Sequence, residues 1–90
     1  MIRQKIIFIG RVQGVGFRYT MTALARQIGL TGYVKNEWDG SVVSEIQGDK
    51  KGIDWLIQQL YEDRYIRIDR IVRENISPVT GERSFYSSYF

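Results

Sequence analysis

Residues 10–20 read "GRVQGVGFRYT", and this stretch decides how the rest of the chain is interpreted. Three of its glycines fall within seven positions, and Arg18 follows two residues after the last of them. Before it, residues 4–12 are rich in Ile, Val and Phe at odd and even positions alike, which is typical of a central strand covered on both faces. After it, residues 18–28 carry apolar side chains at helical spacing, and a glycine follows. The stretch therefore predicts a glycine-rich turn between a strand and a helix.

The same kinds of pattern predict six more segments toward the C-terminus. Asp39 and Gly40 favour a tight hairpin turn between two strands. The apolar positions between 65 and 73 fit a strand and also a helix; we predict a strand, because the preceding helix would otherwise run past about 20 residues. The full expectation is strands at 31–37 and 41–47, a helix at 49–61, a strand at 65–73, a loop at 75–82 and a short final strand within 84–90.

The order of these elements predicts the fold class. Strand, helix, strand, strand, helix and strand make two split βαβ units, which is typical of an α+β, ferredoxin-like βαββαβ sandwich. In that fold an antiparallel sheet carries both helices on one face, and the tail adds a possible short C-terminal strand. No linker, repeat or low-complexity segment interrupts the 90 residues, so we expect one domain over residues 1–90.

The residue types that the chain lacks narrow the possible chemistry. It contains no Cys and no His, which excludes thiol nucleophiles, histidine bases and zinc sites of the usual kind. No apolar run approaches the roughly 20 residues of a membrane helix, and nothing resembles a secretory signal. Without disulfides, a cytoplasmic location is the expectation. The formal net charge of +3 favours anionic ligands without choosing among them.

The turn before the first helix has the composition of an anion-binding loop. A helix start leaves about four backbone N–H groups unpaired and carries a partial positive charge, and glycines let the preceding loop curl around a ligand. The loop is not a Walker loop, because Phe17, Arg18 and Tyr19 stand where Gly-Lys-Ser/Thr would be needed. Arginine offers a planar fork for two phosphate oxygens. From these residues alone, glycines that serve only close packing remain an equal alternative.

Two longer motifs resemble those of one family. The segment "GRVQGVGFR" at 10–18 matches the Gly-x-Val-Gln-Gly-Val-x-Phe-Arg motif of the acylphosphatase family at every fixed position. The segment "GYVKNEWDGSV" at 32–42 likewise matches that family's Gly-x-Val-x-Asn-x-x-Asp-Gly-x-Val motif. The resemblance extends from residue 4 to about residue 72. After the second helix the chain has "YEDRYI", where the family commonly has a Gly-Pro turn.

The resemblance implies an activity and a set of site residues. The family hydrolyses the carboxyl-phosphate bond of acyl phosphates, giving a carboxylate and inorganic phosphate. Arg18 and Asn36 are then the expected catalytic residues, with Asn36 placing the attacking water. The phosphoryl group would be held by the loop residues Gln13, Gly14, Val15, Gly16, Phe17 and Arg18. The resemblance also implies a monomer without cofactor or metal, whose partners are a small acyl phosphate and inorganic phosphate, with no nucleic acid and no membrane.

Two other functions stay open at this point. Ferredoxin-like sheets also serve as non-catalytic anion- or RNA-binding modules, and this basic chain has six Tyr, four Phe and two Trp. That interpretation calls for an aromatic run of the "KGFGFV" kind on a central strand, which the sequence lacks. An accessory domain that kept the fold and lost the activity is the second possibility. Without the motif, a hairpin cap is the preferred explanation of Asn36.

Overall fold

The expected order of elements is confirmed by the structure, a computed structural model that describes residues 1–88. The expected strand at 65–73 is found as a strand that begins at Arg67 and continues to Ile76. The expected tail strand is found in part, since Tyr89 and Phe90 of that segment lie outside the described residues. The elements are β1 (Ile2–Arg11), α1 (Phe17–Gln27), β2 (Thr31–Asn36), β3 (Val42–Gly48), α2 (Lys50–Glu62), β4 (Arg67–Ile76) and β5 (Phe85–Ser88).

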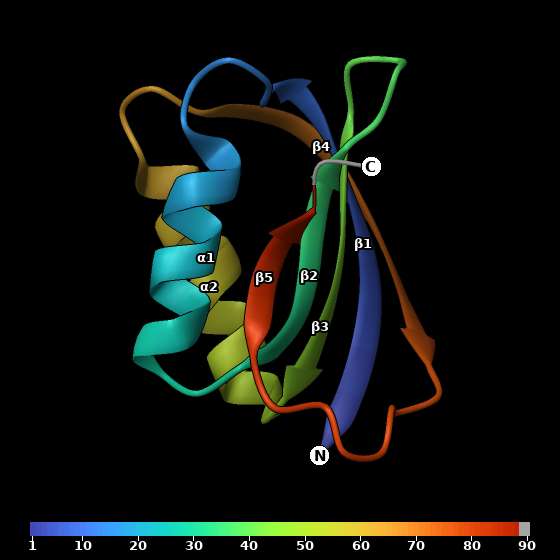
Figure 1. Ribbon diagram of the computed structural model, residues 1–90. Coiled ribbons are helices and arrows are strands. Elements are labelled where there is room, and N and C mark those ends of the chain that lie inside the picture. Colours follow the sequence, from blue (N-terminus) through green and yellow to red (C-terminus); the bar gives the residue numbers. More distant parts are fainter. Residues whose placement is uncertain (89–90) are drawn as a thin grey trace.

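The five strands form one sheet in the order β4-β1-β3-β2-β5, and both helices cover the same face of it (Figure 1). The first four strands pair antiparallel, as the ferredoxin-like order predicts. In contrast, β5 pairs parallel with β2, so the sheet as a whole is mixed. The parallel direction of β5 follows from the route of the chain, because the connection after β4 leads past the start of β1 to the opposite edge of the sheet (Figure 1).

The core lies between the sheet and the two helices. Ile6 and Phe8 of β1 are fully buried against the apolar stripes of α1 and α2, which include Met21 and Leu56. Each such side chain contributes about 1.5–3 kcal/mol by leaving water. The rings of Phe8 and Phe17 meet at a centroid distance of 4.9 Å and an interplanar angle of 60°. This contact anchors the first residue of α1 to the central strand β1, directly beside the glycine-rich turn.

Both helices are short. Helix α1 has 11 residues and α2 has 13. Within residues 1–88, no helix has the length and apolar character needed to cross a membrane.

A buried cluster of ionised groups lies on the sheet face that the helices leave uncovered. The side chain of Arg3 is only 3% exposed, and its guanidinium contacts Glu45 (Nε–Oε1, 2.8 Å) and Glu82 (Nη1–Oε1, 2.8 Å). Gln47 joins the cluster by accepting a hydrogen bond from Arg3, at 3.1 Å, and exchanges two more with the backbone of Val79. Glu82 and Val79 belong to the connection between β4 and β5. The cluster therefore fastens that connection to the sheet.

The cluster changes the acidity of its members. Burial by itself raises the pKa of Glu45, but the hydrogen bonds from Arg3 and Tyr33 outweigh burial and leave that pKa below its ordinary value. Burial is also the largest single influence on Glu82 and raises its pKa, but the hydrogen bonds from Arg3 and Thr31, together with the charge of Arg3, leave that pKa below its ordinary value. Burial, followed by the bond that its hydroxyl donates to Glu45, raises the pKa of Tyr33 to about 12. Because both carboxyl groups bind protons less readily in the folded state, their contribution to stability is present above the unfolded pKa of about 4.3 and lost as the pH falls below it.

We therefore expect acid to destabilise the protein through this cluster. The free energy of unfolding, measured by urea titration, should fall as the pH is lowered from about 5 to 3. Arg3→Met leaves two partly buried carboxylates without their cation, so it should cost about 3–5 kcal/mol at pH 7 and flatten the acid dependence. Arg83→Met, at an exposed arginine of the same connection, is the matched control. If the free energy of unfolding falls with pH equally steeply in wild type and in Arg3→Met, the acid sensitivity does not come from this cluster.

Candidate active site

The turn between β1 and α1 is built around two glycines with left-handed backbone. Gly14 has φ 73° and Gly16 has φ 80°, values that side chains other than glycine rarely adopt. At neither position would an added Cβ meet another atom within 4 Å, so the demand for glycine comes from the backbone conformation. Gly16 is the N-cap of α1, and its carbonyl accepts the first helical hydrogen bond, from the Thr20 N–H at 2.9 Å.

This N-cap leaves the positive end of α1 available to a ligand. Because Gly16 has no side chain, no capping oxygen accepts from the first turn, and that turn contains no acidic residue. The N–H groups of Phe17, Arg18 and Tyr19 precede the first intrahelical donor and have no acceptor within the helix. Together with the helix dipole, these three groups make the end of α1 suited to an anion.

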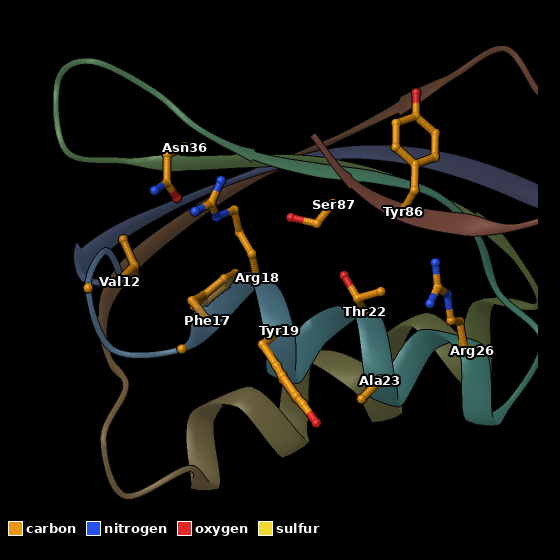
Figure 2. Close-up of a pocket in the computed structure, with 12 residues that line it drawn as sticks. Val12, Phe17, Arg18, Tyr19, Thr22, Ala23, Arg26, Asn36, Tyr86 and Ser87 are labelled. Atoms are coloured by element: carbon orange, nitrogen blue, oxygen red, sulfur yellow. The ribbon is translucent and has the colours of Figure 1, made fainter. Parts of the chain in front are cut away.

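A pocket of about 660 Å³ opens at this end of α1 and continues along the helix beneath β5 (Figure 2). Its walls come from the glycine turn, one face of α1, the end of β2 and part of β5. The ionisable side chains that line it are Arg18, Tyr19, Arg26 and Tyr86, and the ring of Tyr86 points away from the helix (Figure 2). The described lining residues thus contribute two guanidinium groups and no carboxylate, so this part of the chain gives the pocket a positive wall.

The structure brings most of the expected site residues to this pocket. Gly14, Gly16, Phe17, Arg18 and Asn36 all line it. Phe17 has its ring in the core, so the backbone is the part that it offers to the pocket. The side chains of Arg18 and Asn36 extend from opposite walls into the same space (Figure 2). Arg18 also donates from Nη1 to the Ser88 carbonyl, at 3.3 Å.

Two of the expected phosphate-binding residues do not line the pocket. Val15 packs against the core instead. Gln13 uses its side-chain amide to join the turn to the β2–β3 hairpin, donating from Nε2 to the carbonyls of Glu37 (2.7 Å) and Ser41 (2.8 Å). The side chain of Gln13 thus fixes the glycine turn relative to the hairpin that carries Asn36.

The hairpin itself is held by a local turn. Asp39 Oδ1 accepts hydrogen bonds from the backbone N–H of Ser41 (2.9 Å) and from its hydroxyl (2.6 Å). These bonds lower the pKa of the Asp39 carboxyl. Asn36 ends β2, is half buried and makes no side-chain hydrogen bond to residues 1–88. The expected turn role of Asp39 is confirmed, and the amide of Asn36 has no capping partner in the described part of the chain.

Sequence reasoning missed the far half of the pocket. Thr22 and Arg26 come from α1, and Ser87 comes from β5. The first two follow Arg18 at intervals of four residues, so helical spacing places them on the same face of the helix. No local pattern indicated Ser87, because the parallel pairing of β5 with β2 brings it to the site.

Comparison with known proteins gives one consistent result. The family model for acylphosphatase matches residues 4–86. An acylphosphatase of Clostridium acetobutylicum is 38% identical over 90 residues, which is 99% of each chain. A solved acylphosphatase from Bacillus subtilis superposes with a TM-score of 0.90 at 30% identity, covering 99% of this chain and all of the other.

The same fold also occurs inside a larger protein. A solved HypF of T. kodakarensis matches the whole of this chain with a TM-score of 0.84 and 34% identity, although the match covers only 12% of HypF. The family model covers most of this chain, and the C. acetobutylicum and B. subtilis relatives match it from end to end. These findings favour the hydrolase over the binding module, and the chain belongs to the acylphosphatase family.

Proposed function

We propose that this chain is an acid-anhydride hydrolase that cleaves acyl phosphates to a carboxylate and inorganic phosphate, with Arg18 and Asn36 as its catalytic residues. The observation that carries the proposal is the meeting of three features in one pocket. These are the uncapped start of α1, the Arg18 guanidinium and the Asn36 amide. Residues 1–90 act as one acylphosphatase-like domain, a monomer in the cytoplasm that binds neither nucleic acid nor membrane.

The phosphoryl group binds at the start of α1. Its oxygens accept from the first-turn N–H groups and from the two outer nitrogens of Arg18, which match two oxygens at once. The loop residues 13–18 supply the backbone of this cradle. As negative charge shifts over the phosphoryl oxygens in the transition state, donors that are already in place stabilise it without rearranging.

The leaving group explains why the site works without a general acid. When water attacks phosphorus, the bond between phosphorus and the acyl oxygen breaks and the electron pair leaves with a carboxylate. A carboxylic acid has a pKa of roughly 4, so the carboxylate departs without being protonated. The reaction then depends on positioning and on charge stabilisation, which Arg18 and the backbone provide.

Asn36 acts on the nucleophile. Its amide lies across the pocket from Arg18 and holds the attacking water by accepting from it and donating to it (Figure 2). An amide is too weak a base to remove the proton, so a phosphoryl oxygen of the substrate takes it. The side chain of Gln13 is a positioning element here, because its bonds to Glu37 and Ser41 hold the phosphate cradle and the Asn36 hairpin in register.

We expect both catalytic side chains to be required. Removing a preorganised donor costs about 3–4 kcal/mol in the transition state, which is a loss of roughly 10²–10³ in kcat. The measurement is hydrolysis of benzoyl phosphate in EDTA by wild type, Arg18→Ala and Asn36→Ala, with thermal unfolding to establish that each variant is folded. Inorganic phosphate should inhibit the wild type, and Arg18→Ala should bind phosphate more weakly. A folded wild type that leaves benzoyl phosphate intact would refute the proposed function.

The left-handed N-cap gives a second test. Gly16→Ala forces a Cβ into that backbone conformation, which costs about 1–2 kcal/mol of stability and displaces the cradle. Gly81→Ala is the matched control, since Gly81 has φ 81° and open space around its Cβ position but lies in the connection before β5. Both variants should lose similar stability in urea titration, whereas only Gly16→Ala should lose activity. Equal activities in the two variants would mean that the cradle does not bind the substrate.

A further inference from the structure

We infer that the far half of the pocket is a second anion subsite built on Arg26, which selects acyl phosphates whose acyl end carries a carboxylate. The inference rests on the proposed function and extends it from the phosphoryl head group to the acyl part of the substrate. Three observations carry it: the position of Arg26 in the same pocket, the bonding of its guanidinium, and the buried hydroxyl of Thr22.

The pocket joins two cations along one helix face. Arg18, Thr22 and Arg26 are spaced four residues apart on α1, so their side chains lie one above another beneath β5 (Figure 2). Eight residues of helix advance about 12 Å along the axis. A phosphoryl group, a short acyl chain and a second anion, gripped by one arginine at each end, fit a span of this length.

Arg26 is held in place by one edge of its guanidinium. Its Nε donates to the Phe85 carbonyl of β5 at 2.9 Å. Its two outer nitrogens have no hydrogen bond and no carboxylate within salt-bridge distance among residues 1–88. Figure 2 places the guanidinium beside β5, at the end of the pocket away from Asn36. An arginine fixed in this way offers two donors to a ligand and loses little conformational freedom on binding.

The hydroxyl of Thr22 lies between the two arginines and lacks a partner. It is the one buried side-chain oxygen or nitrogen of the described residues that makes no hydrogen bond. A helical threonine often bonds back to the carbonyl four residues earlier, but Thr22 does not do so, and its oxygen points toward β5 (Figure 2). An unpaired buried hydroxyl is unfavourable, and a rotation of the Thr22 side chain toward the pocket would let a polar atom of a bound ligand satisfy it.

The chemistry of the subsite favours a carboxylate as the second anion. Arg26 presents two donors and a single positive charge, which match the two oxygens and single charge of a carboxylate. A doubly charged phosphoryl group finds more donors at the other end of the pocket, where Arg18 and the helix N-terminus act together. A ligand with a phosphoryl group at one end and a carboxylate at the other therefore binds in a single orientation, with its phosphoryl group beside Asn36.

The test uses three substrates with the same reacting group. Benzoyl phosphate, 4-carboxybenzoyl phosphate and 4-carbamoylbenzoyl phosphate differ only at the far end, and the carbamoyl compound matches the size of the carboxylate without its charge. The readout is the ratio of kcat/KM for the carboxy and carbamoyl substrates, corrected for their uncatalysed hydrolysis. A change shared by both substrates cancels in this ratio. We expect wild type to favour the carboxylate by about tenfold, as for a hydrogen bond to a charged group.

Substitutions at Arg26 should remove this selectivity. Arg26→Gln should bring the ratio close to one, Arg26→Lys should retain part of it, and the exposed control Arg83→Gln should leave it at the wild-type value. Raising the salt concentration should lower the wild-type ratio, because the subsite is partly exposed. A wild-type ratio of one, or an unchanged ratio in Arg26→Gln, would overturn the subsite.

A binding measurement separates this inference from the proposed function. The phosphonates 4-carboxybenzylphosphonate and 4-carbamoylbenzylphosphonate carry the same end groups and cannot be hydrolysed. Calorimetry should show that wild type binds the carboxylate more tightly and that Arg26→Gln does not distinguish the two. If wild type hydrolyses no acyl phosphate yet shows this preference, the proposed function fails and the subsite stands. Equal binding of the two phosphonates to wild type overturns the subsite whatever the activity.

Discussion

The left-handed backbone of Gly16 is the constraint on which the site depends. With φ 80° at the N-cap, the chain turns from β1 into α1, and no side chain caps the first-turn N–H groups. A serine or aspartate cap would stabilise the helix by about 1 kcal/mol but would occupy those donors. The turn is then held from two sides, by the Phe8–Phe17 contact in the core and by the amide of Gln13 at the hairpin.

The opposite wall of the pocket depends on contacts far from the chemistry. Strand β5 reaches the edge of β2 only after the chain has crossed from the other edge of the sheet, and Arg3 fastens that crossing through Glu82. Such a buried ion pair adds little net stability compared with apolar packing, but removing one partner leaves an uncompensated charge. The cluster on the uncovered sheet face thus holds the connection that leads into β5, and the pairing of β5 with β2 then places Ser87 at the pocket.

The chemistry of the site is electrostatic. Its polar groups are backbone N–H donors, two guanidinium groups, an amide and hydroxyls, and the described lining residues include no histidine and no carboxylate. This inventory suits a reaction whose leaving group needs no proton and whose transition state is stabilised by fixed donors. In the proposed mechanism this inventory divides recognition between the two ends of the pocket, with Arg18 at the reacting phosphoryl group and Arg26 at the rest of the substrate.

The elements, their order and the glycine turn at one end of the pocket could be predicted from the sequence alone. The periods of the apolar residues located the helices and strands, and the glycines before Phe17 indicated the turn between β1 and α1 because the requirement for left-handed backbone is local. The resemblance of two motifs to those of the acylphosphatase family added Arg18 and Asn36 as the expected catalytic residues. Three features become visible only in the tertiary structure. They are the parallel pairing of β5 with β2, the hydrogen bonds of the Gln13 side chain to the β2–β3 hairpin, and the position of Arg26 at the pocket. Arg26 and Phe85 are 59 residues apart in the chain, and their contact depends on which edge of the sheet the last strand joins, which no short-range pattern encodes.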